Sequence, residues 1–117
     1  MIYYNANSFG NNVEDCTIRS ISVAEGISWD YAYRKLSDYA RERGLMISDV
    51  ESIEEYLDDN YERLCVDDMT VGEFADLNPY GTFLVTMQGH ITAIKDGEII
   101  DTFDPSDRLM WCAWEVM

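Results

Sequence analysis

The chain has 117 residues, of which 47% are hydrophobic and 13% aromatic, enough apolar content for one globular domain with a core. Its net charge of −15 argues against binding to nucleic-acid phosphates or to anionic lipid, and favours a basic partner. No apolar run approaches the roughly 20 residues of a membrane span, and the N-terminus lacks the basic and apolar regions of a signal peptide. We therefore expect one soluble, cytoplasmic domain over residues 1–117.

The N-terminal part is expected to be a loop that leads into a short helix. Residues 1–14 are rich in Asn, Ser and Gly, which favour turns over regular structure. Apolar residues then recur at helical spacing, between an expected N-cap and a glycine suited to the C-terminal cap. These positions are Asp15, Ile18, Ile21, Ala24 and Gly26.

Three more helices are predicted downstream. One runs from its N-cap Ser28 to Gly44, with an inward stripe of Trp29, Tyr33, Leu36 and Ala40. Another covers about residues 52–61, with Ile53, Tyr56 and Leu57 facing inward. The last runs from Thr70 to about Leu77, because Thr70-Val71-Gly72-Glu73 matches a capping box and Pro79 follows.

From Gly81 the pattern becomes that of strands. Strands are predicted at residues 82–87, 90–95, 98–103 and 109–116. Asp96-Gly97 is a strong signal for a type I′ hairpin turn. Helices followed by an antiparallel sheet indicate a single α+β domain.

The acidity is concentrated in residues 47–78, where eleven acidic side chains face one basic residue, Arg63. Two interpretations remain: a solvated helical face, or a surface that mimics nucleic acid or attracts a cationic partner. The spacing of a calcium loop is absent. The three cysteines fit neither a disulfide framework nor a zinc site, so no metal or cofactor is predicted and Cys65 and Cys112 are expected in the core.

Cys16 is the candidate nucleophile. At the start of a helix, unpaired backbone N–H groups and the helix dipole favour an anionic sulfur. The neighbouring Asp15 carboxylate opposes a second negative charge, whereas Arg19, four residues after Asp15, can neutralise that carboxylate.

His90 and Asp101 are the candidate base and its orienting carboxylate. A two-residue turn at Asp96-Gly97 fixes the register of the hairpin, which pairs Lys95 with Glu98, Ile94 with Ile99, Ala93 with Ile100 and Thr92 with Asp101. His90 and Asp101 then lie diagonally on one face, which they share with Thr92, Ile94, Ile99 and Phe103. A carboxylate there can fix the imidazole and leave its other nitrogen free to deprotonate a thiol. Asp104 falls on the opposite face and is the weaker candidate.

These residues resemble those of the papain-like cysteine peptidase superfamily. The runs Tyr4-Asn5-Ala6-Asn7, Asp15-Cys16-Thr17-Ile18-Arg19-Ser20-Ile21-Ser22, Gly89-His90-Ile91-Thr92-Ala93-Ile94-Lys95-Asp96-Gly97 and Asp101-Thr102 are also similar to short uncharacterised proteins of phages and prophages of Gram-positive bacteria. The superfamily resemblance implies a minimal papain-like fold with Cys16 as nucleophile, His90 as general base and then acid, and Asp101 as orienter.

The resemblance also implies an oxyanion hole made by the Cys16 backbone N–H and an upstream side-chain amide. Papain-like enzymes often place Gln six residues before the Cys, but Gly10 stands at that position. Asn11 or Asn12 must then supply the amide, and Asn12 is slightly preferred.

Three functions follow as hypotheses. The leading one is a thiol hydrolase that cleaves a peptide, isopeptide or related amide, with a basic host or phage polypeptide as substrate. The second is a catalytically weak or inactive papain-fold protein that binds a host protein through its acidic surface, in the host cytoplasm if the chain is phage-encoded. The third is an acyltransferase of transglutaminase type. The sequence predicts no oligomeric state.

Overall fold

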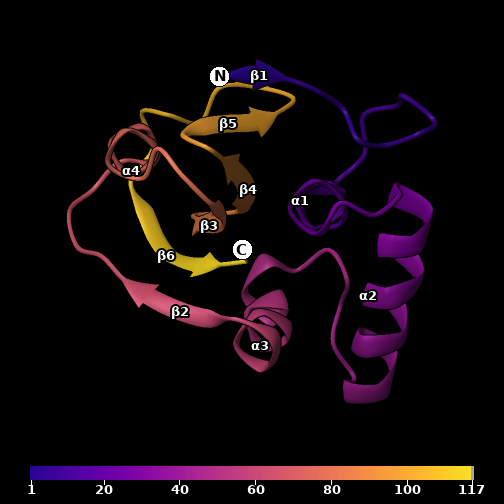
Figure 1. The fold of residues 1–117 in the computed structure, drawn as a ribbon. Helices are drawn as coiled ribbons and strands as arrows, with labels where there is room; N and C mark the ends of the chain where they lie inside the picture. Colours follow the sequence, from indigo (N-terminus) through magenta and orange to yellow (C-terminus); the bar gives the residue numbers. More distant parts are fainter. Residues whose placement is uncertain (117) are drawn as a thin grey trace.

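The computed structural model describes residues 1–116, and the side chains of all of these except Glu51 and Cys65. Within this range the fold is mixed α+β, with four helices and one six-stranded sheet (Figure 1). The helices are α1 (Cys16–Glu25), α2 (Trp29–Arg43), α3 (Val50–Asn60) and α4 (Val71–Leu77). The strands are β1 (Ile2–Tyr3), β2 (Glu62–Cys65), β3 (Thr82–Met87), β4 (His90–Lys95), β5 (Glu98–Asp101) and β6 (Met110–Glu115). The Cα radius of gyration is 13.1 Å, as expected of a compact chain of this length.

The sheet has the strand order β1-β5-β4-β3-β6-β2 and is mixed. Most neighbours are antiparallel, but β1 runs parallel to β5. The prediction of an antiparallel sheet is therefore wrong at this edge, where residues 1–14 were expected to form only a loop. A two-residue edge strand carries too few residues for a period-2 pattern, and it is held through backbone bonds such as Tyr4 N–H to the Asp101 carbonyl, 2.8 Å.

The second edge strand, β2, was also not predicted. Its sequence Glu-Arg-Leu-Cys contains no β-branched or aromatic residue, so it gives no strand signal. It forms because its backbone pairs with β6, in a register that places Glu62 opposite Glu115 and Cys65 opposite Cys112. Short charged edge strands limit pairing with other chains.

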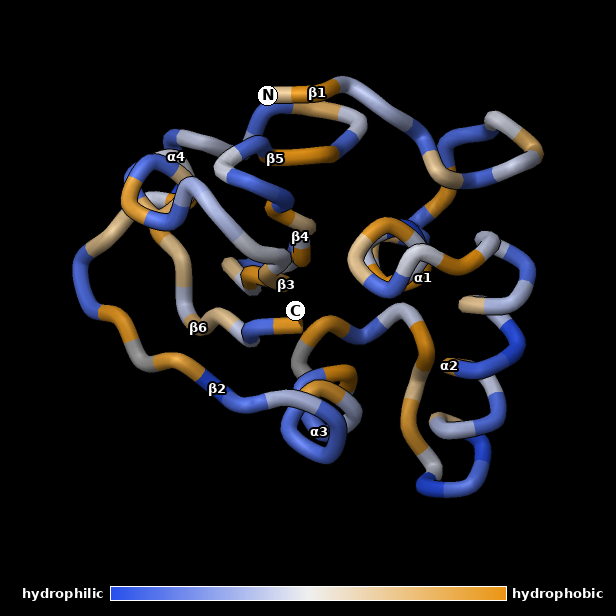
Figure 2. Tube along the Cα trace, in the orientation of Figure 1, coloured by the Kyte–Doolittle hydropathy of each residue, from blue (hydrophilic) through white to orange (hydrophobic). Residues whose placement is uncertain are grey.

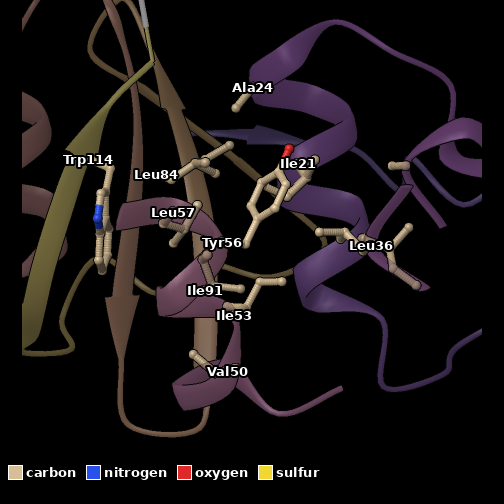
Figure 3. Close-up of a cluster of buried hydrophobic side chains, with 13 residues drawn as sticks. Ile21, Ala24, Leu36, Val50, Ile53, Tyr56, Leu57, Leu84, Ile91 and Trp114 are labelled. Carbon is tan, nitrogen blue, oxygen red and sulfur yellow. The ribbon is translucent and has the colours of Figure 1, made fainter. Parts of the chain in front are cut away.

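Helices cover both faces of the sheet, as Figure 1 shows: α1 and α3 lie on one face, α2 packs outside α1, and α4 lies on the other face. The larger core joins the first face to its helices (Figure 3). Its fully buried members include Ile21 from α1, Leu36 from α2, Leu57 from α3 and Trp114 from β6. Figure 2 shows the corresponding hydropathy pattern, with apolar segments along the central strands and mostly polar segments along α2.

The predicted ends of α2 and the predicted capping box of α4 are confirmed, whereas α3 begins two residues and ends one residue before its predicted bounds of 52–61. The Ser28 hydroxyl accepts a hydrogen bond from the Tyr31 backbone N–H at 3.1 Å, and Gly44 ends α2 in the left-handed conformation. Thr70 and Glu73 form both hydrogen bonds of a capping box.

The predicted inward stripe of α2 is partly wrong. Tyr33 is 44% exposed, whereas Ala32 is fully buried together with Leu36. Helix α2 packs on α1 along a narrow stripe at i, i+4 and i+8, where the small Ala32 and Ala40 allow close approach. Tyr33 instead packs on the Trp29 ring, 5.3 Å between centroids.

Within the described residues, no helix combines the length and apolar character that crossing a membrane would require.

Candidate active site

The hairpin of β4 and β5 brings His90 to Asp101. The predicted pairs Ala93 with Ile100, Ile94 with Ile99 and Lys95 with Glu98 are all present, and both turn residues have positive φ, as a type I′ turn requires. The Nε2 atom of His90 lies 2.7 Å from Oδ2 of Asp101, and both residues are buried. The register alone therefore placed these two side chains together.

Asp101 is held as a carboxylate by several donors. The Thr92 hydroxyl donates to Oδ2 at 2.7 Å, and the Thr102 backbone N–H donates to Oδ1 at 2.7 Å. Burial raises the pKa of Asp101, but the hydrogen bonds from His90 and Thr92, the His90 charge and the Thr102 N–H together lower it below its ordinary value. The Thr92 contact was foreseeable, because Thr92 lies opposite Asp101 in the predicted register.

His90 interacts with both Asp101 and Cys16. The Asp101 carboxylate can only accept, so Nε2 carries the hydrogen in this bond and Nδ1 is left for Cys16. Burial lowers the pKa of His90, but hydrogen bonds to Asp101 and Cys16 and the charges of both raise it above its ordinary value. The Phe103 ring packs against the imidazole, 4.7 Å between centroids. Phe103 shared a face with His90 in the predicted hairpin, although β5 itself ends at Asp101.

Cys16 is the first residue of α1 and is partly exposed. Asp15 occupies the N-cap position as predicted, but its side chain makes no cap hydrogen bond. The carboxylate accepts instead from Arg19 Nε at 2.7 Å, Trp29 Nε1 at 2.9 Å and Asn7 Nδ2 at 3.2 Å. The Cys16 backbone N–H makes no hydrogen bond to a protein group among residues 1–116. As the first N–H of the helix, it points out of the positive end of α1.

Arg19 joins the two acidic residues of the site. Besides its ion pair with Asp15, its Nη1 lies 3.3 Å from Oδ1 of Asp101 and donates to the Thr102 hydroxyl at 2.9 Å. The side chain is only 13% exposed. The neutralisation of Asp15 was predicted, whereas the link to Asp101 depends on how α1 packs beside β4 and β5 and has no signal in the sequence.

The two candidate oxyanion amides are not brought into contact with the triad. Asn11 and Asn12 are both exposed, and neither makes a described hydrogen bond to Cys16, His90 or Asp101. The Asn11 side-chain oxygen accepts from Asn7 Nδ2 at 2.7 Å within the N-terminal loop. The weaker carboxylate candidate, Asp104, is exposed and accepts the Ser106 backbone N–H at 3.0 Å.

The cysteines and acidic residues form no metal site in the described part of the chain. Cys112 is partly buried against the core, close to its predicted place, and Arg63 Nη1 donates to its sulfur at 3.4 Å. The prediction for Cys65 concerns a side chain outside those described.

The site thus combines a partly exposed thiol at a helix start, an imidazole, and a buried carboxylate that binds the imidazole. Nucleophilic catalysis at acyl carbon uses these three groups in this order. Family models, curated proteins and solved structures were compared with the chain, and none of them matches it.

Proposed function

We propose that the protein is a thiol hydrolase with a minimal papain-like fold, which cleaves a peptide, isopeptide or related amide through a thioester on Cys16. The observation that carries the proposal is the 2.7 Å contact between His90 Nε2 and Asp101 Oδ2, on an imidazole whose pKa the Cys16 thiol also raises. A thiol, a base and an orienting carboxylate are the three groups that nucleophilic catalysis at an acyl carbon requires.

The chemistry follows from these positions. The Cys16 sulfur attacks the acyl carbon while Nδ1 of His90 takes the thiol proton, and His90 then gives that proton to the departing nitrogen. A water deprotonated by His90 next breaks the thioester. Asp101 keeps the imidazole oriented and stabilises its charged form.

The uncapped start of α1 supports the same proposal. An oxyanion formed at the acyl carbon beside Cys16 can accept the backbone N–H of Cys16, which no side chain occupies among the described residues. Because Arg19 and Trp29 bind the Asp15 carboxylate, its negative charge is offset close to the sulfur. Asn12 or Asn11 is the proposed second donor, after a loop movement on substrate binding.

Iodoacetamide labelling tests the nucleophile. Both thiols are partly exposed, but we expect Cys16 to be alkylated faster than Cys112 because His90 activates it. Mass spectrometry of peptides measures the two rates. His90→Ala should remove this preference, whereas Asp104→Asn, at an exposed carboxylate that does not contact His90, should keep it. Equal labelling of both cysteines in the folded protein would refute the proposal.

A further inference from the structure

Arg108 has no acidic partner among the described residues, although the chain is rich in carboxylates. Six of the 8 basic side chains form ion pairs: Arg19, Arg34, Lys35, Arg41, Arg43 and Arg63. Arg108 and Lys95 form none within the described residues, and Asp107, next to Arg108, makes no ion pair with it. An exposed guanidinium left unpaired at a net charge of −15 is available to an external anion.

Arg108 also belongs to the surroundings of the triad. Its guanidinium carbon lies 5.2 Å from the centroid of the Phe103 ring, and that ring lies 4.7 Å from the imidazole of His90. The three groups are therefore in contact in sequence, from the imidazole outward, with the imidazole and the Phe103 ring tilted by 48° to each other. Stacking on an aromatic face holds the guanidinium in place while its donors stay free.

An open groove of ≈ 560 Å³ adjoins this stack. Arg108 lines it together with Met87, Gln88, Leu109 and Trp111. Leu109 is 63% exposed and Trp111 is 41% exposed, and Gln88 lies in the turn that leads directly into His90. The groove thus offers an apolar wall, one amide and one cation, and the Phe103 ring lies between that cation and the His90 imidazole.

We propose that this groove binds the departing amine part of the substrate, and that Arg108 pairs with a carboxylate on it. The inference rests on the proposed function. His90 must give its proton to the departing nitrogen while the acyl carbon stays bonded to the Cys16 sulfur, so the departing part lies on the His90 side. The favoured departing group is an amino acid or short peptide that carries an apolar side chain and a carboxylate. Two parallel N–H donors of Arg108 would bind that carboxylate.

The groove can be tested by running the acylation step in reverse, with an added amine that takes the place of the departing amine. p-Nitrophenyl acetate acetylates Cys16, and an added amine can then attack the thioester from the groove to form an acetylated product. The acceptors are leucine against leucinamide, and Leu-Glu-amide against Leu-Gln-amide. These pairs distinguish an α-carboxylate from a side-chain carboxylate.

We expect at least one carboxylate acceptor to give about tenfold more acetylated product than its neutral partner. Arg108→Gln should remove that preference. Lys95→Gln is the matched control, because Lys95 is the other unpaired cation and lies at the far end of β4 from His90, and it should keep the preference. Equal use of both members of each pair by the unmodified protein, or a preference that survives Arg108→Gln, would overturn the inference.

A binding measurement separates this inference from the proposed chemistry. Failure to acetylate Cys16 would count against the proposed hydrolase. Binding to the groove is then measured by NMR on the Cys16→Ser protein, which needs no reaction at Cys16. Leu-Glu-amide or leucine should then shift the side-chain resonances of Arg108 and Trp111, and the neutral partners should shift them much less. The absence of such shifts would overturn the inference whatever the outcome at Cys16.

Discussion

His90 is the only histidine, so its protonation can be followed through a single imidazole resonance. Although burial lowers its pKa, Asp101 and Cys16 raise it above the ordinary value. Asp101→Asn keeps an oxygen that accepts from Nε2 but removes the charge. We therefore predict that the pKa of His90 is lower in Asp101→Asn than in the unmodified protein, measured by NMR titration. Asp104→Asn should leave it unchanged, and an unchanged value in Asp101→Asn would mean that the 2.7 Å contact does not stabilise the imidazolium.

The raised pKa of His90 also predicts how stability depends on pH. A group whose pKa is higher in the folded state binds its proton more tightly there, so its contribution is complete below 6.5, the ordinary value, and is lost as pH rises through the folded-state pKa. We expect the difference in free energy of unfolding between Cys16→Ser and Cys16→Ser/His90→Gln to be largest in mildly acidic solution and to shrink at alkaline pH. Urea denaturation at several pH values measures this difference in free energy of unfolding. Both variants carry Cys16→Ser, so that protonation of the Cys16 thiol does not contribute to the pH dependence. A difference that does not vary with pH would contradict the prediction.

At the scale of elements, Arg19 is the polar link between α1 and the end of β5. Its guanidinium contacts Asp15 and Asp101, whose side chains are 5% and 4% exposed. Arg19→Met would leave both carboxylates buried without their cation, at a cost of about 3–5 kcal/mol. We predict a loss of that size in chemical denaturation.

Arg41→Met is the matched control for Arg19→Met. Arg41 pairs with Asp38 on the exposed side of α2, where both side chains are about 70% exposed (73%/69%), and such pairs contribute roughly 0–1 kcal/mol. A similar loss in the two variants would show that Arg19 does not act as a buried link.

Sequence patterns predicted the elements that carry their own local signals. The glycine and hydroxyl caps of α2, the capping box at Thr70 and the turn at Asp96-Gly97 each depend on residues close together in the chain. The hairpin register followed from that turn, and with it the meeting of His90 and Asp101. The site was therefore predictable where local geometry determines it.

Features that depend on long-range packing were not predicted. β1 and β2 form only because β5 and β6 offer them backbone partners. Tyr33 satisfied the helical period but lies beyond the narrow contact between α2 and α1. Asp15 is a good N-cap by type, yet the tertiary partners Arg19 and Trp29 bind its carboxylate instead. In each case a contact from elsewhere in the fold outweighed the local preference.

For the whole molecule, the net charge of −15 is the largest long-range electrostatic effect. Repulsion among like charges destabilises the compact state, and salt screens it over about 10 Å at 0.1 M. Several acidic side chains around α3 and β2 are exposed and make no described hydrogen bond or ion pair, among them Glu55, Glu62 and Asp67. We therefore predict that the melting temperature rises as sodium chloride is added, by about 4 °C for each kcal/mol of repulsion screened.

The variant Glu55→Lys/Glu62→Lys/Asp67→Lys tests the origin of that salt effect. Three reversals lower the magnitude of the net charge without removing a described contact, so its melting temperature in low salt should exceed that of the unmodified protein. Its rise with sodium chloride should also be smaller. The exposed ion pair of Arg41 and Asp38 works in the opposite direction, because salt weakens it. A melting temperature that falls with salt in the unmodified protein would mean that such pairs outweigh the repulsion among the acidic side chains.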